Sequence, residues 1–414
     1  MPARTTAKLL GPTSRYALIQ GSYWACYCSI ITFSSVYLLF RGFSNSQIGV
    51  LISAAGVLSA ILQPFVSRLA DGLRRMSLRQ FSALLVLFQL AAGSLLLLLP
   101  GRLPQTILYA LLLILIQLVM PLCSALGMAC INSGLALNFG VARSGGSIAY
   151  GVFSALCGQL VLWFGALSIP VAMTILNLIF LAAVFTFKFK GVEGEPEAIN
   201  QSQPEKTGGR PFFLKYRRVL WILFGIVCLL ISHNVLNTYA FQIIQPLGGD
   251  SGQMGTMLMI QSLVELPVMF LFSWMVSRAS SRFWLRISGI GFFLHALGAL
   301  LAPNMLVMDV IQIFEMNGYA LFALASIYYV NEMVENNERV QGQAWFSMAM
   351  TLGSVLASAL GGLLLDYASV FVLLVFAAAA GAVGMAIFWV LLAKGTVTMT
   401  PVNQSALLPI SRKL

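Results

Sequence analysis

Charged side chains are scarce in this chain of 414 residues. Asp, Glu, Lys and Arg make up only 9% of it, hydrophobic residues make up 59%, and the mean hydropathy is +0.89. Soluble domains carry about 25% charged residues, so the shortage excludes a chain of ordinary soluble domains. Apolar runs of about 20 or more residues recur instead, which is the length that crosses a bilayer core of roughly 30 Å. The sequence therefore predicts an all-α protein embedded in the lipid bilayer.

Side chains that carry metal or redox chemistry are also few. The sequence has two histidines and six cysteines, and no two cysteines form a CxxC pair. All six cysteines fall within apolar runs, so we interpret them as buried free thiols. The sequence contains no nucleophile–base set, phosphate-binding glycine loop or cluster of metal ligands. We therefore predict neither an enzyme nor an ATP-driven pump, and neither a cofactor nor a metal ion.

Twelve apolar runs are present, which predicts twelve transmembrane helices. They lie at about 16–40, 45–67, 77–99, 104–131, 141–164, 166–187, 219–245, 253–277, 284–302, 304–330, 341–365 and 368–393. The polar stretch GVEGEPEAINQSQPEKTGGRP, residues 191–211, separates the sixth run from the seventh, and its composition is typical of a flexible linker. We thus predict an N-terminal six-helix half (1–190), a cytoplasmic linker (191–215) and a C-terminal six-helix half with a short tail (216–414).

Lysine and arginine gather in the loops of one side. Only Arg41 and Arg102 fall in loops of the other side. Such asymmetry predicts that both termini and the linker are cytoplasmic, in a cell membrane. The net charge of +11 comes from basic residues dispersed over short loops, so we predict no nucleic-acid partner. The residues of the basic side are Arg68, Arg74, Arg75, Arg79, Lys188, Lys190, Lys206, Arg210, Lys215, Arg217, Arg218, Arg278, Arg282, Arg286, Lys394, Arg412 and Lys413.

The two halves repeat short patterns. Gln47-x-Gly49 opens the second run, and Gln253-x-Gly255 opens the eighth. Arg143-x-x-Gly146 opens the fifth run in the same way that Arg339-x-x-Gly342 opens the eleventh. Paired halves are typical of transporters, which bind their substrate near the midplane between the repeats.

One segment resembles a known signature. QPFVSRLADGLRRMSL, residues 63–78, is similar to the second-loop motif of the major facilitator superfamily: Asp71 and the arginines after it match, whereas Ser67, Gly72 and Arg74 depart from it. FGVARSGGSIAYG (139–151) and LGSVLASALGGLLLDY (352–367) resemble the fifth and eleventh helices of its oligosaccharide–proton symporters, the lactose permease type. The resemblance covers most of the chain at low similarity. It implies two pseudo-symmetric six-helix halves. Asp71 is predicted to be a gating residue rather than a ligand, because a carboxylate beside arginines in a cytoplasmic loop can brace a neighbouring helix end in one state.

The charge network of that family is mostly replaced in this chain. Arg143 falls on the family's sugar-binding arginine, but the fourth-helix glutamate that partners it has no counterpart in CSALGMACIN. Galactoside specificity and the family's proton pathway therefore do not carry over. The other matched positions are Asn234 and Asn237 on two aspartates, His295 on an arginine, Gln312 on a lysine, Glu315 on a histidine and Gly318 on the proton-linked glutamate.

Four titratable residues fall inside predicted spans of the C-terminal half. Glu265 lies within MLMIQSLVELPVMFLF, and Glu315, His233 and His295 lie in other apolar runs. A charge at a helix centre costs roughly 2.5–3.5 kcal/mol on insertion scales, so these side chains are expected to avoid lipid. Each acid is either a fixed packing residue or a protonation site that couples protons to transport. We take all four as proton-coupling candidates.

Polar and aromatic residues at helical spacing are the candidates for substrate contact. Gln20, Tyr23, Trp24 and Tyr27 share one face of the first span, a pattern that suits a sugar or nucleoside but also suits ordinary packing. Arg143 is open to two interpretations, because its echo Arg339 favours a structural role. The complete candidate set is Gln20, Tyr23, Trp24, Tyr27, Asn132, Arg143, Tyr150, Asn234, Asn237, Gln312 and Trp345.

We predict a secondary transporter that acts as a monomer on a small-molecule substrate. Proton-coupled symport of a neutral polar solute, such as an oligosaccharide or nucleoside, is the favoured interpretation. A proton-driven exporter of amphipathic compounds is the alternative, and it would need an acid within the membrane in the N-terminal half. A non-transporting scaffold or receptor, the third class, would not need buried acids in a duplicated frame.

Overall fold

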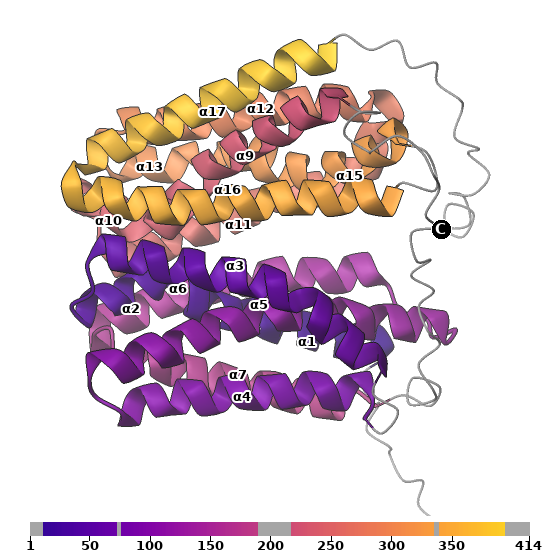
Figure 1. Ribbon diagram of the computed structural model, residues 1–414, viewed down its shortest axis with the longest axis vertical. Helices are drawn as coiled ribbons and strands as arrows, with labels where there is room; N and C mark the ends of the chain where they lie inside the picture. Colours follow the sequence, from indigo (N-terminus) through magenta and orange to yellow (C-terminus); the bar gives the residue numbers. More distant parts are fainter. Residues whose placement is uncertain (1–10, 73–75, 189–216, 335–338, 394–414) are drawn as a thin grey trace, which may run out of the picture.

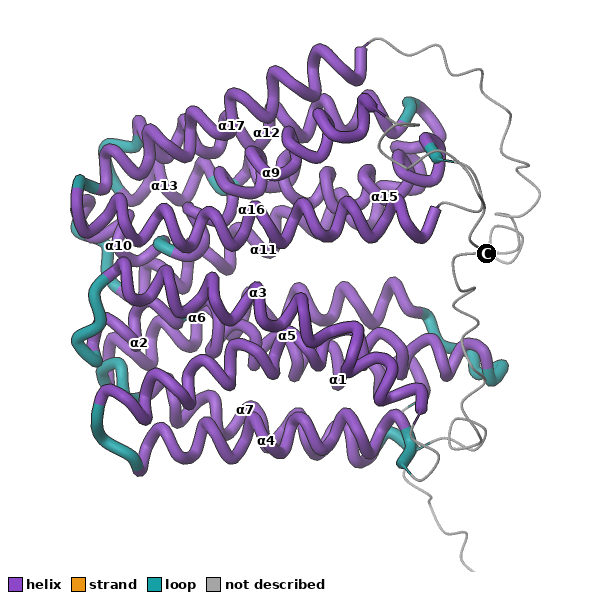
Figure 2. The backbone as a smooth tube through the Cα atoms, viewed as in Figure 1, coloured by secondary structure: helices purple, strands orange, loops and turns teal. Residues whose placement is uncertain are grey.

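The computed structural model describes residues 11–72, 76–188, 217–334 and 339–393, and every regular element in these ranges is a helix (Figure 1, Figure 2). Eleven helices are long and apolar enough to cross a membrane, and a bent pair of helices makes a twelfth span. The prediction of an all-α membrane protein with twelve spans is confirmed. The predicted linker, 191–215, lies wholly outside the described residues.

Each half of the chain contributes one helical bundle. The first consists of α1 (Pro12–Tyr27), η1 (Cys28–Thr32), α2 (Ser34–Phe40), α3 (Asn45–Gly72), α4 (Leu78–Leu98), α5 (Arg102–Asn132), α6 (Phe139–Phe164) and α7 (Ser168–Thr186). The second consists of α9 (Arg217–Thr238), α10 (Ala240–Ile244), η2 (Gln245–Leu247), α11 (Ser251–Arg278), α12 (Ser281–Leu301), α13 (Met305–Ile311), α14 (Ile313–Glu315), η3 (Met316–Ala320), α15 (Leu321–Met333), α16 (Arg339–Tyr367) and α17 (Val370–Ala393).

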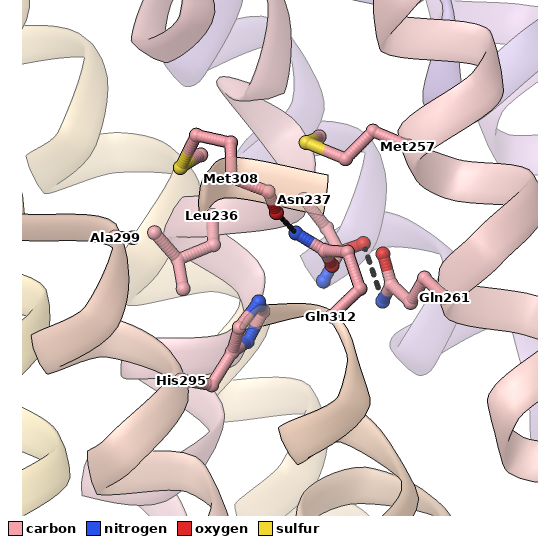
Figure 3. Close-up of a pocket in the computed structure, with 8 residues that line it drawn as sticks. All are labelled: Leu236, Asn237, Met257, Gln261, His295, Ala299, Met308 and Gln312. Atoms are coloured by element: carbon pink, nitrogen blue, oxygen red, sulfur yellow. Dashed lines mark hydrogen bonds between the residues drawn. The ribbon is translucent and has the colours of Figure 1, made fainter. Parts of the chain in front are cut away.

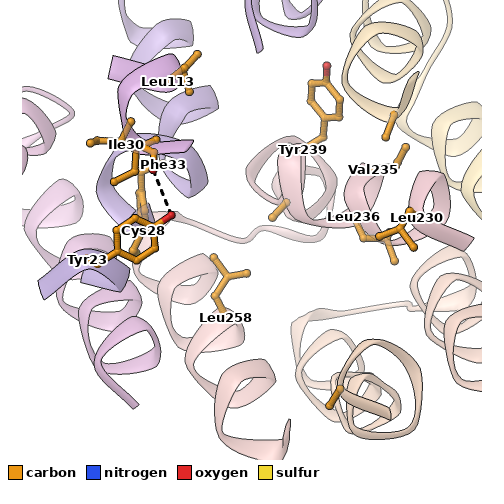
Figure 4. Packing of buried hydrophobic residues seen from close by; sticks show 14 of the residues in the cluster. Tyr23, Cys28, Ile30, Phe33, Leu113, Leu230, Val235, Leu236, Tyr239 and Leu258 are labelled. Atoms are coloured by element: carbon orange, nitrogen blue, oxygen red, sulfur yellow. Dashed lines mark hydrogen bonds between the residues drawn. The ribbon is translucent and has the colours of Figure 1, made fainter. Parts of the chain in front are cut away.

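The bundles lie side by side, with α3 against α16 and α6 against α11 at their interface (Figure 1). Buried apolar residues of both halves join in one hydrophobic cluster, part of which Figure 4 shows around Tyr23, Leu236 and Leu258. We call the end where α7 stops and α9 starts the linker end. The opposite end, where α3 and α11 start, is the loop end.

Two spans are interrupted by π-helical turns. The first passes through η1 and bends by 42° before α2. The tenth breaks after α13 and contains η3 directly after Glu315. A Cβ on Gly291 of α12 would lie 2.4 Å from the Gly318 backbone nitrogen, so only glycine lets α12 approach this turn. Single π turns within helices are frequent at functional sites.

The Gln-x-Gly pattern that both halves share has a physical cause at the loop end. Gln47 and Gln253 each stand third in a helix and hydrogen-bond back to the residue before its start, Ser44 and Asp250, in reciprocal capping boxes. Gly49 and Gly255, two residues later, let the halves touch. A Cβ on Gly49 would lie 2.2 Å from the Ser358 carbonyl oxygen, and one on Gly255 would lie 2.3 Å from that of Ser154.

Hydrogen bonds between the halves also gather at the loop end. The Asp366 carboxylate of α16 accepts from the backbone nitrogens of Asn45 at 3.1 Å and Ser46 at 2.7 Å, so it caps α3 from the other half. The Ser251 hydroxyl donates to the Gly158 carbonyl at 3.2 Å. Toward the linker end the two bundles draw apart (Figure 2). The structure is therefore the state in which the loop end is closed.

Candidate functional site

A cation and three aromatic rings meet where α1 packs on α6. The Arg143 guanidinium lies 4.5 Å from the centre of the Trp24 ring, which is a cation–π contact. Trp24 also contacts Tyr27, with ring centres 5.1 Å apart, and Tyr150 at 6.3 Å. Gly146 makes room for the indole, because a Cβ there would lie 2.5 Å from Trp24 Cδ1. We call Trp24, Tyr27, Arg143 and Tyr150 the arginine–aromatic cluster.

The four residues predicted to share one face of the first span contact two different neighbouring helices in the structure. Gln20 is buried and donates to the Tyr16 hydroxyl at 2.7 Å, and Tyr23 is buried with its hydroxyl on the Ile116 carbonyl of α5 at 3.3 Å. Trp24 and Tyr27 remain half-buried on the side that faces α6. A helix face about 100° wide can contact two neighbouring helices at once. One edge of this face, with Tyr23, packs against α5, and the other edge, with Trp24 and Tyr27, packs against α6.

The two histidines of the sequence converge on one carboxylate. Glu315 Oε1 lies 2.7 Å from His295 Nδ1 of α12 and 3.1 Å from His233 Nδ1 of α9. Glu315 is 1% exposed, His295 4% and His233 8%. A buried carboxylate is tolerated only with such partners, and groups this close share protons as a unit. We call these residues the His–Glu–His triad.

The π-turn after Glu315 places Tyr319 on the triad. The Tyr319 and His233 rings stack with centres 4.5 Å apart and an angle of 4° between their planes. On its other side Tyr319 interacts electrostatically with Glu265 and with Arg143 of the opposite half. The triad and the arginine–aromatic cluster therefore face each other across the interface between the halves, with Tyr319 between them.

Glu265 stands apart from both clusters. Its side chain is half-buried on α11 and, among the residues that the structure describes, it has no hydrogen bond or ion pair. It is near enough to interact electrostatically with Glu315 and Arg143. Arg143 is likewise half-buried. In the same described ranges it has no hydrogen bond or ion pair, and its guanidinium group makes a cation–π contact with the Trp24 ring. A carboxyl group and a guanidinium group, both without a hydrogen bond or ion pair in the described ranges, thus lie on opposite halves.

Amide side chains line a small pocket beside the triad (Figure 3). Gln261 donates to Asn237 Oδ1 at 3.1 Å, and Asn237 donates to the His233 carbonyl at 3.0 Å. Gln312 is 2% exposed and donates to the Met308 carbonyl at 2.9 Å, while its Oε1 has no partner among the described atoms. The pocket is lined by Leu236, Asn237, Met257, Gln261, His295, Ala299, Met308 and Gln312.

The remaining candidates lie elsewhere. Asn132 is exposed where α5 ends at the linker end, and Asn234 donates to the Leu230 carbonyl of its own helix at 2.7 Å. Trp345 is half-buried on α16. The side chain of Asp71, the predicted gating residue, lies outside the described part of the chain. Within the described ranges, no group of His, Cys, Asp and Glu side chains is arranged to hold a metal ion.

The candidate set from the sequence lacks two residues that the structure brings to this region, Gln261 and Tyr319, and a third, Asp309, that lines a separate groove. Gln261 precedes Glu265 by four residues on the same helix face, which is a signal that could have identified it. Tyr319 shares a face with Gln312 and Glu315 in the sequence but was not predicted to bind anything. Asp309, between the apolar residues of α13, lines a groove of about 370 Å³ with Ile260 and Val264, and its Oδ1 has no partner among the described atoms.

Comparison with known proteins places the chain in a family. The model of the MFS_1 like family matches residues 18–376. No curated protein matches the sequence significantly.

Solved structures share the fold at low identity. The nucleoside transporter NupG superposes with a TM-score of 0.77 and 13% identity, over 93% of this chain and 100% of that one. A bacterial homologue of the iron transporter ferroportin, in an inward-facing state, gives 0.70 and 13% identity over 92% and 99%. The peptide transporter POT in complex with sulfate gives 0.65 and 13% identity over 95% and 96%. These relatives are membrane transporters rather than enzymes, and their likeness confirms the two-half arrangement of the helices.

Proposed function

Because the chain belongs to the MFS_1 like family of multi-pass membrane transporters, we propose that it carries a neutral polar solute together with protons by alternating access. The solute site lies between the halves, bounded by the arginine–aromatic cluster on one side and by Glu265 and Tyr319 on the other. A small nucleoside or oligosaccharide suits this site, and the protein acts as a monomer.

The observation that carries the coupling proposal is the His–Glu–His triad. Glu315 is 1% exposed yet lies within 3.1 Å of two imidazoles, so it can gain or lose a proton without leaving a bare buried charge. Histidine is the side chain whose ordinary titration falls nearest to physiological pH. A purely structural carboxylate would need one fixed donor, whereas two titratable donors on separate helices allow proton exchange.

Aromatic and amide groups support a neutral solute. Trp24, Tyr27 and Tyr150 offer ring faces for a base or a sugar ring, and Arg143 offers hydrogen-bond donors that its contact with Trp24 leaves available. The nucleoside transporter NupG shares this fold, which agrees with a solute of that chemistry.

One observation favours a second solute class. Arg143 and Glu265 are groups that can carry opposite charges on opposite halves, and neither has a hydrogen bond or ion pair in the described ranges. A zwitterion such as a dipeptide would pair its carboxylate with Arg143 and its ammonium group with Glu265.

Uptake into proteoliposomes separates the solute classes. With an inward pH gradient, we expect labelled nucleosides or disaccharides to accumulate and dipeptides not to. Glu265→Gln removes the anion that an ammonium group would need, so a neutral solute should lose less than about tenfold in apparent affinity, or roughly 1.4 kcal/mol. Accumulation of dipeptides, lost with Glu265→Gln, would establish the zwitterion class instead. Uptake that does not depend on the pH gradient would overturn the proposal of proton coupling.

The orientation in the membrane is a separate prediction. The excess of Lys and Arg in the loops of the linker end indicates that this end faces the cytoplasm. A reporter enzyme that works only in the cytoplasm should therefore be active when it is fused at residue 200 or at the C-terminus. A reporter that works only outside the cell should be active when it is fused after Gly248. The reverse pattern would invert the topology and make the closed loop end the cytoplasmic one.

A further inference from the structure

We propose that the two histidines serve opposite sides of Glu315: His295 exchanges protons with a one-water pocket toward the loop end, and His233 exchanges them with the interface between the halves. The inference rests on the proposed function, in which Glu315 carries the proton. It adds a route to the carboxylate that does not pass through the solute site.

The pocket beside His295 has the size and chemistry that a single water molecule needs. It offers about 10 Å³ to the centre of a water molecule, close to the minimum for one buried water. Its polar lining consists of Asn237, Gln261, His295 and Gln312. Gln312 Oε1 is a buried acceptor without a partner among the described atoms, and its side chain extends into the pocket in Figure 3. A water that donates to this oxygen would satisfy it.

His295 connects this pocket to the carboxylate. The ring lines the pocket (Figure 3), and its Nδ1 is 2.7 Å from Glu315 Oε1, so one imidazole touches both. In the described part of the chain its second ring nitrogen has no protein partner. That nitrogen is therefore available to a water in the pocket.

His233 connects the carboxylate to the opposite side. Its Nδ1 is 3.1 Å from Glu315 Oε1, and its ring stacks on Tyr319 at 4.5 Å. Tyr319 in turn interacts electrostatically with Glu265 and Arg143 at the interface. The titratable and charged groups around Glu315 are thus His233 from α9, His295 from α12, Tyr319 from η3, Glu265 from α11 and, across the interface, Arg143 from α6.

The position of the pocket gives the route a direction. Leu236 and Ala299 lie in the last turns of α9 and α12, and Met257 lies near the start of α11, so the pocket is on the loop-end side of Glu315. With the linker end cytoplasmic, that side faces outward. The His233 ring stacks on Tyr319, which interacts with Glu265 and Arg143 at the interface between the halves.

The proton balance is simple. Neutral His295 donates its Nδ1 proton to the Glu315 carboxylate as its Nε2 accepts a proton from the pocket water. The water is reprotonated from outside. The protonated carboxyl group then gives its proton to the bare Nδ1 of His233 as Nε2 of the same ring releases one toward the interface. Each ring ends as its other tautomer and returns to the first by exchanging a proton between its two nitrogens before the next cycle. One proton enters, one leaves, and no bond other than N–H and O–H changes.

The test measures how uptake depends on pH at each side separately. In proteoliposomes of defined orientation, initial rates of solute uptake are recorded while the pH is varied on the loop-end side alone and then on the linker-end side alone. We expect His295→Gln and Gln312→Leu to remove the dependence on loop-end pH, and His233→Gln to remove the dependence on linker-end pH. A gradient of one pH unit should drive about tenfold accumulation of solute in the native chain and about onefold, that is none, in each of the three variants.

Controls separate the possible failures. Gln117→Leu removes a glutamine that, like Gln312, donates to a backbone carbonyl of its own helix four residues earlier, but in the N-terminal half; it should behave as the native chain does. Solute exchange at equal pH shows which variants are folded, and Gln312→Met is a second pocket variant if Gln312→Leu is inactive. If both histidine variants lose the two dependences together, or neither does, the division of roles is wrong. A native chain without any pH dependence refutes the proposed function itself.

Discussion

Glu315→Gln is expected to lower solute accumulation from as much as about fiftyfold to parity, while exchange of solute across the membrane continues. One proton that enters down a potential of 100 mV supplies roughly 2.3 kcal/mol. At about 1.4 kcal/mol per tenfold, this supports a gradient on the order of fiftyfold. Gln keeps the size of the side chain and can still bond to His233 and His295, but it cannot bind the proton. Uphill transport therefore stops, whereas exchange, which needs no net proton release, persists.

The matched variant is Glu265→Gln. Both acids lie in the membrane on neighbouring helices, but Glu265 has no partner in the described ranges whereas Glu315 has two. We expect Glu265→Gln to keep proton-driven accumulation and to change affinity for solute. The measurement is the steady-state ratio of labelled solute inside and outside proteoliposomes, beside its exchange rate. If Glu265→Gln loses accumulation and Glu315→Gln keeps it, Glu265 is the residue that binds the proton. If Glu315→Gln also loses exchange, the triad has a structural role in packing.

Gly49→Ala and Gly255→Ala are expected to hold the loop end open. The added methyl group would lie 2.2 Å from the Ser358 carbonyl oxygen in the first variant and 2.3 Å from that of Ser154 in the second. Both obstacles are backbone atoms, so the helices must separate. Overpacking of this kind costs about 1–3 kcal/mol, which shifts a two-state equilibrium by roughly 5–150-fold. Turnover should fall to a similar degree, because alternating access requires that the loop end close.

Distances between spin labels at Leu103 and Leu306, both exposed at the loop end, report the shift. The longer distance should dominate in both glycine variants. Gly56→Ala is the matched control on the same α3–α16 contact, since its methyl group would meet Val355 Cγ2 at an ordinary 3.4 Å. If the control opens the loop end as much, or the other two variants do not, close approach at these glycines does not hold the halves together.

The spans and their ends could be predicted from the sequence because each depends on local features. A hydrophobic run long enough to cross the bilayer forms a helix whatever its neighbours are, since no water is present to satisfy its backbone. The breaks within the first and tenth spans were not predictable in this way. No proline lies at either π turn.

The membrane-embedded titratable residues were also identified from the sequence, because a charge in an apolar run is conspicuous and costly. Their partners were not. Glu315 and His233 are 82 residues apart in sequence, and only the packing of α9, α12 and the tenth span brings both imidazoles to one oxygen. Glu265, in the most conspicuous stretch of the chain, is the acid that packing leaves without a partner.

The sequence by itself thus determined which side chains must avoid lipid, and the tertiary structure decided what each one meets. The stripe on the first span illustrates the difference. Periodicity placed Gln20, Tyr23, Trp24 and Tyr27 on one face, but the rotation of α1 between α5 and α6 brings Tyr23 to the Ile116 carbonyl of α5 and Trp24 to Arg143 of α6. Helix rotation results from many weak contacts along two or three neighbouring helices, and no single stretch of sequence contains the information that sets it.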